Sequence, residues 1–388
     1  MMNGSQHPVR WMMMMMSLLV AMAVLSACGF GQGGNATETA GGSSGDGSSD
    51  VASDETPEPG ALPRDFRANL LFPPALSSTR LNDQIELMGT VIYNASSITI
   101  VPTATLSESE LILEQCNNTE TAVSFMPASA YLVGRQLCGL TAAGTLGRDG
   151  RTQHYVMLLV RNNSLATSVR DLNDLTWTVA DPGLSNEYAY TVQMFREVGA
   201  TPGNVIPAVN QADAIRKLLN HEAEFAAVAF RPPRTVPPWQ EGQSPEPFAA
   251  ERQNVRYEIE TGRSLWNQVE LLDARVLQAH EYPDIFALTR IVALSPPVPN
   301  EVLVFGRQFD QAARNTLQLA LVLFFQSAEC QQSLCNDPTF AWTSLDAYSE
   351  AAMLPVQSRL DAAAIDAINV FGADVVENFT DARNAAAP

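Results

Sequence analysis

The sequence predicts an α/β protein made of two lobes. From about residue 66 onward, short runs rich in apolar and β-branched residues alternate with stretches of helical periodicity. Such alternation favours parallel α/β units. The alternation occurs twice, before and after a short polar joint at 161–164. Two α/β series separated by a joint indicate two lobes.

The first series consists of strand patterns that are each followed by a helical pattern. Ser107 and Glu110 stand in the arrangement of a capping box, which marks the start of a helix just before residue 111. Pro102 is expected to end the strand that precedes this helix, because proline cannot donate a backbone hydrogen bond. The predicted strands cover 68–72, 98–101, 122–126 and 155–160, and the predicted helices cover 81–88, 111–116 and 131–137.

The second series repeats this order and then becomes irregular. Gly199 is expected to end the helix at 186–198. Residues 231–260 are rich in Pro, Glu, Gln and Arg, and we expect a surface excursion there. The predicted strands cover 177–180, 225–230 and 291–294, the predicted helices cover 186–198, 212–219, 310–327 and 356–370, and 295–300 is a proline-rich extended crossing.

These patterns divide the body of the chain into two lobes. Lobe 1 is predicted to combine 66–164 with 295–388. Lobe 2 is predicted to cover 165–294, including the excursion at 231–260. The chain would then cross twice between the lobes.

The first 27 residues have the features of an export signal. A short head carrying Arg10 precedes an apolar run at 11–27, which ends in Leu25-Ser26-Ala27 before Cys28. The run is shorter than the roughly 20 apolar residues of a membrane-spanning helix. Residues 28–65 are dominated by small and polar residues that cannot offset the entropy of ordering. They are predicted to form a flexible tether.

Composition and motifs exclude several classes of function. The formal net charge of −19 leaves no basic patch for a polyanion, so nucleic acid is not an expected partner. The sequence contains no G-x-S-x-G elbow and no phosphate-binding loop. The four histidines are scattered, at 7, 154, 221 and 280. We therefore expect neither an enzyme nor a metal or cofactor.

Four cysteines remain when Cys28 is set aside. An even number in an exported protein indicates disulfides, and four cysteines allow three pairings. Proximity in the sequence favours Cys116–Cys138 and Cys330–Cys335. The first pair closes a loop of about 20 residues, which in the chain-entropy model contributes roughly 3 kcal/mol. Metal binding is the competing interpretation, but the spacing of a metal site is missing.

Several segments carry a resemblance to a known family. Leu25-Ser26-Ala27-Cys28 resembles the bacterial lipobox, in which the cysteine becomes lipidated. Four further segments, in order, resemble the phosphate/phosphonate-binding family of ABC-transporter substrate-binding proteins, which have the type II periplasmic binding fold. They are A-V-S-F-M-P-A-S-A-Y-L at 122–132, D-L-N-D-L-T-W-T-V-A-D-P at 171–182, A-I-R-K-L-L-N-H-E-A-E-F-A-A-V at 214–228 and P-V-P-N-E-V-L-V at 297–304.

The resemblance implies a lipid-anchored, extracytoplasmic protein on a bacterial cell membrane. It implies two lobes with a small anionic solute in the cleft between them, bound where helix N-termini supply free N–H groups. It also implies an ABC permease and an ATPase as partners. Closure of the lobes around the solute would present the closed form to the permease.

Six residues are candidates for ligand contact on the strength of this resemblance. Ser185 and Asn186 match hydroxyl positions of the turn that holds the anion in the family. Ser185 has a structural alternative as a helix N-cap, with Glu187 as a stabilising first-turn acid. The other four candidates are Ser129, Tyr131, Gln211 and Thr105.

Other positions depart from the family pattern. Ala229 stands where relatives that bind aminophosphonates have an acid, which argues against 2-aminoethylphosphonate as the ligand. Leu184 and Leu106 replace ligand-contacting residues. Arg231 is either a partner for an anion or a solvated loop residue.

Two functions follow as hypotheses. The first is a lipid-anchored solute-binding protein of an ABC importer for phosphonate, phosphate or a related small oxyanion. The second is a binding module outside transport, such as an extracytoplasmic sensor or adhesion lipoprotein that reuses the fold.

Overall fold

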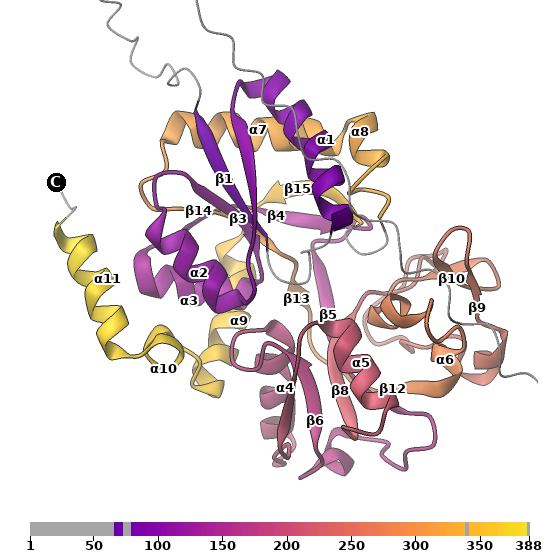
Figure 1. Ribbon diagram of the computed structural model, residues 1–388. Coiled ribbons are helices and arrows are strands. Elements are labelled where there is room, and N and C mark those ends of the chain that lie inside the picture. Colours follow the sequence, from indigo (N-terminus) through magenta and orange to yellow (C-terminus); the bar gives the residue numbers. More distant parts are fainter. Residues whose placement is uncertain (1–65, 73–78, 338–340, 386–388) are drawn as a thin grey trace, which may run out of the picture. The chain divides into compact units, whose positions relative to one another are not determined.

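The computed structural model describes residues 66–72, 79–337 and 341–385. The predicted signal segment at 1–27, Cys28 and the predicted tether at 28–65 lie outside these residues. Within the described part, two mixed sheets with helices on their faces form the centres of two lobes (Figure 1). This arrangement confirms the α/β fold predicted from the alternating pattern.

The sheet of lobe 1 has a parallel centre and an antiparallel extension. β1 pairs in parallel with β2 and β3, while β14 runs antiparallel between β3 and β4. Its strands, in spatial order, are β15 (Trp342–Ala347), β4 (Thr141–Arg148), β14 (Val302–Phe305), β3 (Ala122–Met126), β1 (Arg67–Phe72) and β2 (Thr99–Ala104). The sequence patterns predicted β1, β2 and β3 but not β4, β14 or β15.

Pro102 does not end β2, contrary to the expectation from the sequence. It lies inside the strand and pairs in register with Leu70. β2 is the edge strand of the sheet, so no further strand needs the hydrogen bond that proline cannot donate.

The sheet of lobe 2 is built in the same way. β6 pairs in parallel with β7 and β8, and β5 runs antiparallel to β8 and β12. β5 therefore lies in the second sheet, although the predicted lobe boundary fell after it. Its strands, in spatial order, are β12 (Thr289–Leu294), β5 (Gln153–Arg161), β8 (Phe225–Phe230), β6 (Trp177–Ala180) and β7 (Val205–Ala208), with β13 (Val298–Pro299) paired to β5.

The helices follow the strands as the pattern predicted, with some shifts at their ends. The predicted helix at 356–370 is interrupted at Ala364, which has a left-handed backbone (φ 55°). Lobe 1 carries α1 (Thr79–Ser96), α2 (Glu108–Asn117), α3 (Ala128–Cys138), α7 (Gln311–Phe325) and α8 (Ala328–Gln331), lobe 2 carries α4 (Asn186–Glu197), α5 (Gln211–Leu219) and α6 (Ile285–Leu288), and the C-terminal part forms α9 (Glu350–Ala363), α10 (Ala367–Phe371) and α11 (Ala373–Ala385). Among the described residues, no helix has both the length and the apolarity of a membrane span.

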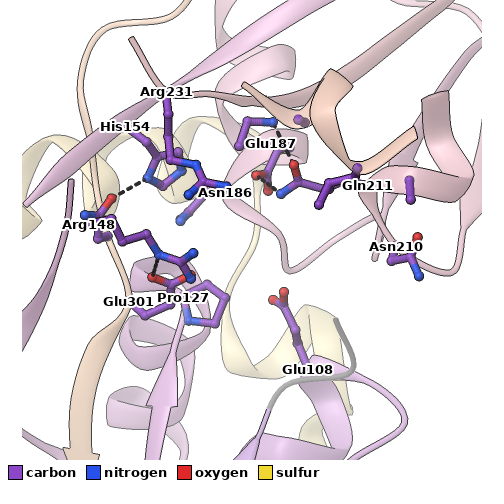
Figure 2. Close-up of a pocket in the computed structure, with 15 residues that line it drawn as sticks. Glu108, Pro127, Arg148, His154, Asn186, Glu187, Asn210, Gln211, Arg231 and Glu301 are labelled. Atoms are coloured by element: carbon purple, nitrogen blue, oxygen red, sulfur yellow. Dashed lines mark hydrogen bonds and ion pairs between the residues drawn. The ribbon is translucent and has the colours of Figure 1, made fainter. Parts of the chain in front are cut away.

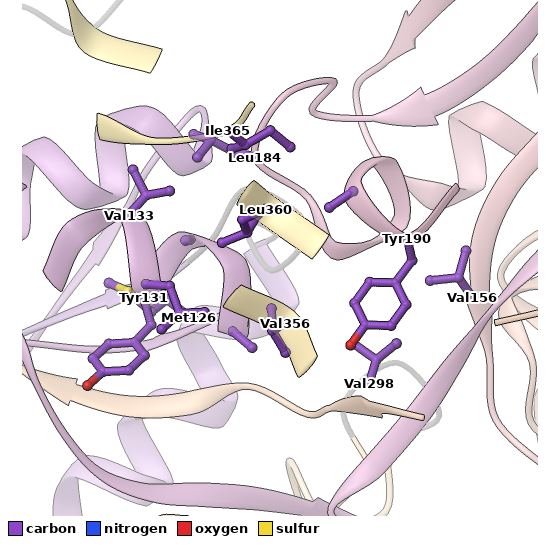
Figure 3. Packing of buried hydrophobic residues seen from close by; sticks show 14 of the residues in the cluster. Met126, Tyr131, Val133, Val156, Leu184, Tyr190, Val298, Val356, Leu360 and Ile365 are labelled. Atoms are coloured by element: carbon purple, nitrogen blue, oxygen red, sulfur yellow. The ribbon is translucent and has the colours of Figure 1, made fainter. Parts of the chain in front are cut away.

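One apolar cluster connects the two lobes. Val356 and Leu360 of α9 are fully buried and belong to the same cluster as residues of α3 and α4. Figure 3 shows them between Tyr131 of α3 on one side and Tyr190 of α4 on the other. α9 therefore packs against α3 of lobe 1 and α4 of lobe 2 through hydrophobic contacts.

The excursion at 231–260 is anchored to lobe 2 by a buried ion cluster. Arg275, which is fully buried, donates to both carboxylate oxygens of Asp273 (2.9 and 2.8 Å) and to Glu246 of the excursion (2.6 Å). Its guanidinium carbon lies 4.4 Å from the ring centre of Phe286. The following chain forms a small antiparallel sheet of β9 (Arg256–Glu258), β10 (Arg263–Trp266) and β11 (Val269–Leu271).

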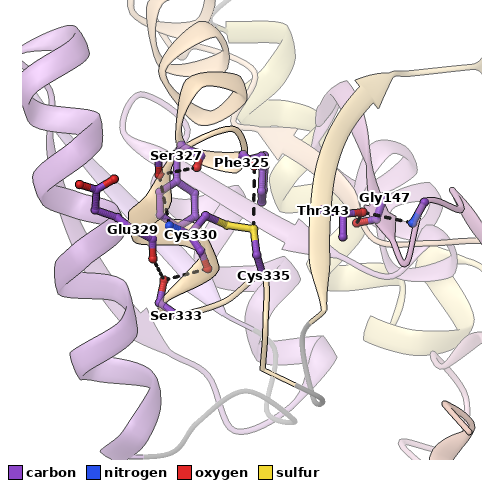
Figure 4. Close-up of a disulfide and its surroundings, with 10 residues drawn as sticks. Gly147, Phe325, Ser327, Glu329, Cys330, Ser333, Cys335 and Thr343 are labelled. Atoms are coloured by element: carbon purple, nitrogen blue, oxygen red, sulfur yellow. Dashed lines mark hydrogen bonds between the residues drawn. A yellow bond between two sulfur atoms is a disulfide. The ribbon is translucent and has the colours of Figure 1, made fainter. Parts of the chain in front are cut away.

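Both predicted disulfides are present in the structure. Cys116–Cys138 joins the C-terminal ends of α2 and α3, with the Cα atoms 5.7 Å apart. Cys330–Cys335 closes a short turn after α8 (Figure 4), with the Cα atoms 5.1 Å apart. Both bridges lie in lobe 1, where they cross-link helix ends that are also hydrogen-bonded.

Candidate ligand-binding site

A cavity of about 220 Å³ lies where the two lobes meet. It is smaller than the roughly 300–1,000 Å³ of sites for drug-sized ligands, so it suits a small solute. Its lining comes from both lobes and from the crossings between them: Glu108, Pro127, Arg148, His154, Asn186, Glu187, Asn210, Gln211, Ala212, Ala229, Arg231, Ala274, Leu277, Asn300 and Glu301.

The parallel strands explain where this cavity lies. Glu108 and Pro127 stand at the starts of α2 and α3, just after β2 and β3. Glu187 and Gln211 stand at the starts of α4 and α5, just after β6 and β7. The carboxyl ends of parallel strands in both lobes thus face the same space, which is where α/β proteins bind ligands.

One end of the cavity contains guanidinium groups (Figure 2). Arg148, at the end of β4, donates to both carboxylate oxygens of Glu301 (2.9 and 2.5 Å). Burial raises the pKa of Glu301, but Arg148 more than offsets this, so the pKa lies below its ordinary value. Arg231 lies near Asp149, with Nη1 3.9 Å from Oδ2. Burial, with the charge of Arg148, lowers the pKa of Arg231 to about 10, so it is still a cation at neutral pH.

His154 of β5 and Asn300, which directly follows β13, are hydrogen-bonded to each other beside these arginines. The amide nitrogen of Asn300 donates to the carbonyls of Leu146 (3.1 Å) and Arg151 (2.8 Å). Its oxygen, 3.0 Å from Nδ1 of His154, must then accept a hydrogen bond from that nitrogen. Nε2 of His154 is the acceptor nitrogen in this tautomer. Burial lowers the pKa of His154 to about 4, so the ring is neutral near pH 7.

The other end of the cavity is acidic. Glu187, 8% exposed, accepts a hydrogen bond from Nε2 of Gln211 (3.0 Å). Oε1 of Gln211 accepts one from the backbone N–H of Ala229 (3.0 Å), so Gln211 is held in one orientation. Burial, with a contribution from Glu301, raises the pKa of Glu187 to about 7. Burial and then the negative charges of Asp181, Glu187 and Glu301 raise the pKa of Glu108 well above its ordinary value.

Two of the six candidates from the sequence, Asn186 and Gln211, line the cavity. Asn186 also contacts the other lobe, because its Oδ1 accepts from the N–H of Ser129 (3.1 Å). The hydroxyl of Ser129 donates to the carbonyl of Leu184 (2.5 Å). Ser129 and Asn186 are therefore brought together by the fold, as a hydrogen-bonded contact between α3 and α4.

Ser129 lies outside the lining, and so do the other three candidates. Ser185 is the N-cap of α4, where its hydroxyl accepts from the N–H of Tyr188 (3.2 Å). Tyr131 is 3% exposed and packs edge-to-face on Tyr348, with ring centres 5.8 Å apart. The hydroxyl of Thr105 donates to the carbonyl of Phe72 (2.8 Å) at the end of β1. The structure gives each a structural contact, and their part in ligand binding stays a prediction.

The sequence left most of the charged lining unnamed. Arg148 belongs to β4, a strand that the pattern did not indicate. Arg231 lines the cavity with its side chain 13% exposed, so of the two roles considered from the sequence the solvated one does not hold. Glu301 directly follows the P-V-P-N segment, so the resemblance pointed to its neighbourhood without assigning it a role. Among the residues that the structure describes, no group of three or more His, Cys, Asp or Glu could hold a metal ion.

Solved structures align with most of this chain. A binding protein component of an ABC phosphonate transporter from Pseudomonas aeruginosa aligns with a TM-score of 0.56 at 13% identity, over 82% of this chain and 99% of that chain. A Prochlorococcus marinus protein in complex with methylphosphonate aligns with a TM-score of 0.55 at 8% identity, over 77% of this chain and 98% of that chain. A Xanthomonas citri protein bound to chloride aligns with a TM-score of 0.52 at 12% identity, over 81% of this chain and 99% of that chain. The type II periplasmic binding fold predicted from the sequence is thereby confirmed.

Comparison of the sequence with known families gives the same result. No curated protein matches this sequence significantly. The family model described as "ABC transporter, phosphonate, periplasmic substrate-binding protein" matches residues 70–337, more than half of the chain. The family consists of solute-binding proteins rather than enzymes, as the sequence predicted. The chain therefore belongs to the family of periplasmic substrate-binding proteins of phosphonate ABC transporters.

Proposed function

We propose that this protein is a lipid-anchored, extracytoplasmic solute-binding protein of an ABC importer, and that it holds a small oxyanion in the cavity between its lobes. The observation that carries the proposal is the position of the cavity, which both lobes line at the carboxyl ends of their parallel strands. A solute there bridges the lobes and favours their closed arrangement. The partners are a membrane permease, which receives the closed form, and a cytoplasmic ATPase.

Donors for an oxyanion are present in the cavity. Arg148 and Arg231 supply guanidinium groups, and Asn186 keeps its amide nitrogen as a donor while its oxygen binds Ser129. Guanidinium groups attract oxyanions through their charge and their several N–H donors, two of which Arg148 already uses on Glu301. The complexes of similar proteins with methylphosphonate and with chloride also support an anionic solute.

The ligand site is tested by filling the cavity. Ala229→Leu adds apolar volume to the lining and is expected to abolish ligand-induced stabilisation. The panel contains phosphate, methylphosphonate, aminoalkyl phosphonates, sulfonates and carboxylates, and thermal unfolding is the readout. A ligand at 100 times its Kd adds about 2.7 kcal/mol, a shift of several degrees for the unmodified protein. Ala250→Leu, at an exposed position of the excursion, is the control. If a ligand raised the unfolding temperature of Ala229→Leu and Ala250→Leu equally, the solute would bind outside this cavity.

The lipid anchor is tested at Cys28. The order of the apolar run, Leu25-Ser26-Ala27 and Cys28 supports lipidation at this cysteine. In a bacterial host, the chain is expected to incorporate labelled fatty acid and to fractionate with the membrane. Cys28→Ser is expected to lose both properties, while Cys330→Ser keeps the label. Membrane association that survives Cys28→Ser without a label would contradict the proposed anchor.

A further inference from the structure

Two carboxylates from opposite lobes face the acidic end of the cavity. Glu108 is the first residue of α2 in lobe 1, and Glu187 belongs to the first turn of α4 in lobe 2. Figure 2 shows Glu108 extending from α2 toward the cavity, on the side opposite Gln211. Oε2 of Glu108 is buried and has no hydrogen-bond partner among the described residues. A buried oxygen without a partner at the wall of a cavity indicates a group that a ligand satisfies.

The charged side chains around Glu108 and Glu187 do not balance the negative charge of these two carboxylates. The side chains whose charges act on Glu108 are Asp181, Glu187 and Glu301, and each of them is negative. Glu187 receives a neutral hydrogen bond from Gln211 and a further unfavourable charge from Glu301. Buried carboxylates in proteins are normally paired with a cation, so this arrangement opposes folding. Neither carboxyl has a cationic side chain among the described residues whose charge lowers its pKa, so a cationic group of a ligand would be favoured between them.

At each of the two helix starts beside these carboxylates, one backbone N–H is already engaged. The N–H of Glu108 donates to Oδ2 of Asp181 (3.0 Å), and the N–H of Tyr188 donates to the hydroxyl of Ser185 (3.2 Å). An anion at this end would therefore meet two carboxylates and engaged N–H groups. Arg148 and Arg231 are the cationic side chains of the described cavity lining, Arg148 in an ion pair with Glu301 and Arg231 near Asp149, and an oxyanion is best placed at them.

We propose that the solute is a zwitterion, whose ammonium group lies between Glu108 and Glu187 and whose oxyanion lies at Arg148 and Arg231. This inference rests on the proposed function and names the class of solute. The position of Ala229 argued from the sequence against an amine-bearing ligand. The fold instead brings in carboxylates from two other segments, each at the start of a helix, and closes them over the same space.

Matched pairs of small molecules test the charge of the solute. Each pair shares the oxyanion and differs in the amine: 2-aminoethylphosphonate with ethylphosphonate, taurine with ethanesulfonate, and β-alanine with propionate. Calorimetric titration of the full-length chain at pH 7.5 is expected to show at least about tenfold tighter binding for the amine-bearing member of the preferred pair. The pair with the tightest binding identifies the oxyanion.

Glutamine variants then locate the ammonium group. Glu187→Gln and Glu108→Gln keep the shape of each side chain but remove its charge. Each is expected to weaken the affinity for the amine-bearing ligand at least about tenfold. The affinity for the amine-free counterpart is expected to stay unchanged or to increase. Glu197→Gln, at an exposed position near the far end of α4, is the control and should change neither affinity.

The possible failures are distinguishable. Equal affinity of the two members of every pair would overturn the zwitterion while leaving the solute-binding function intact. Unchanged affinity in both glutamine variants would overturn the placement of the ammonium group. Binding of no member of any pair, in protein freed of bound solute by unfolding and refolding, would overturn both the inference and the proposed oxyanion function.

Discussion

Replacing Arg275 with alanine is expected to lower the free energy of unfolding by about 4 kcal/mol, because it leaves the buried carboxylate of Asp273 without its cation and removes one of the two cations of Glu246. Asp273 is 3% exposed and Glu246 is 5% exposed, and both depend on this guanidinium. Although burial lowers the pKa of Arg275, Asp273 and Glu246 hold it above its ordinary value, so the side chain is charged. Glu246, which belongs to the excursion, also accepts from Arg252 (2.5 Å) and keeps that partner in the variant.

Chemical denaturation of the full-length chain measures this effect. Arg275→Lys keeps the charge but not the forked geometry that contacts both partners, and we expect an intermediate loss. Arg256→Ala, at an exposed position of β9, is the control and should change stability by less than about 0.5 kcal/mol. If Arg275→Ala were as stable as this control, the cluster would not be what anchors the excursion to lobe 2.

Glu187→Gln is expected to make the ligand-free protein more stable at pH 8 by about 3 kcal/mol, since burial raises the pKa of Glu187 to about 7 from an ordinary value near 4.5. Between these two values the folded state binds more protons than the unfolded state. The unfolding free energy of the unmodified protein therefore falls as the pH rises through this window. Below pH 4.5 the carboxyl is protonated in both states, and the advantage of the variant disappears.

Urea denaturation at pH 4.5, 6 and 8 measures this dependence. The difference between the variant and the unmodified protein reports the titration of Glu187 together with its effect on Glu108, because the other titrating groups are common to both. Glu197→Gln on the same helix should follow the unmodified protein at every pH. A difference between Glu187→Gln and the unmodified protein that stays constant from pH 4.5 to 8 would contradict the buried state of this carboxyl. A residue that destabilises the empty protein and strengthens binding of an ammonium group is best explained by ligand recognition.

Local patterns predicted the elements whose signals are local. The strands β3, β6 and β8 were predicted with the bounds that the structure shows, because each is a short, buried apolar run between turn signals. β4 was missed because its sequence, T-A-A-G-T-L-G-R, has mostly small side chains. β4 forms because β14 and β15 pair with it on either side.

The cavity was predicted less completely than the fold. Asn186 and Gln211 were predicted because they stand at helix starts that resemble a known family, and both line the cavity. Glu108, Arg148 and Arg231 come from segments far apart in the sequence, and no local pattern relates them. Burial and mutual charge also set their pKa values, and both quantities depend on the assembled fold.

The sequence by itself determined the α/β alternation, the two disulfides and the family, because periodicity, cysteine spacing and ordered motifs are properties of short segments. Tertiary structure alone decided which charges share the cavity. It placed Glu108 and Glu187 at one end without a cation and Arg148 and Arg231 at the other. Electrostatic interactions act through space, and they are strong where folding removes water, so the chemistry of the site appears only when the two lobes come together.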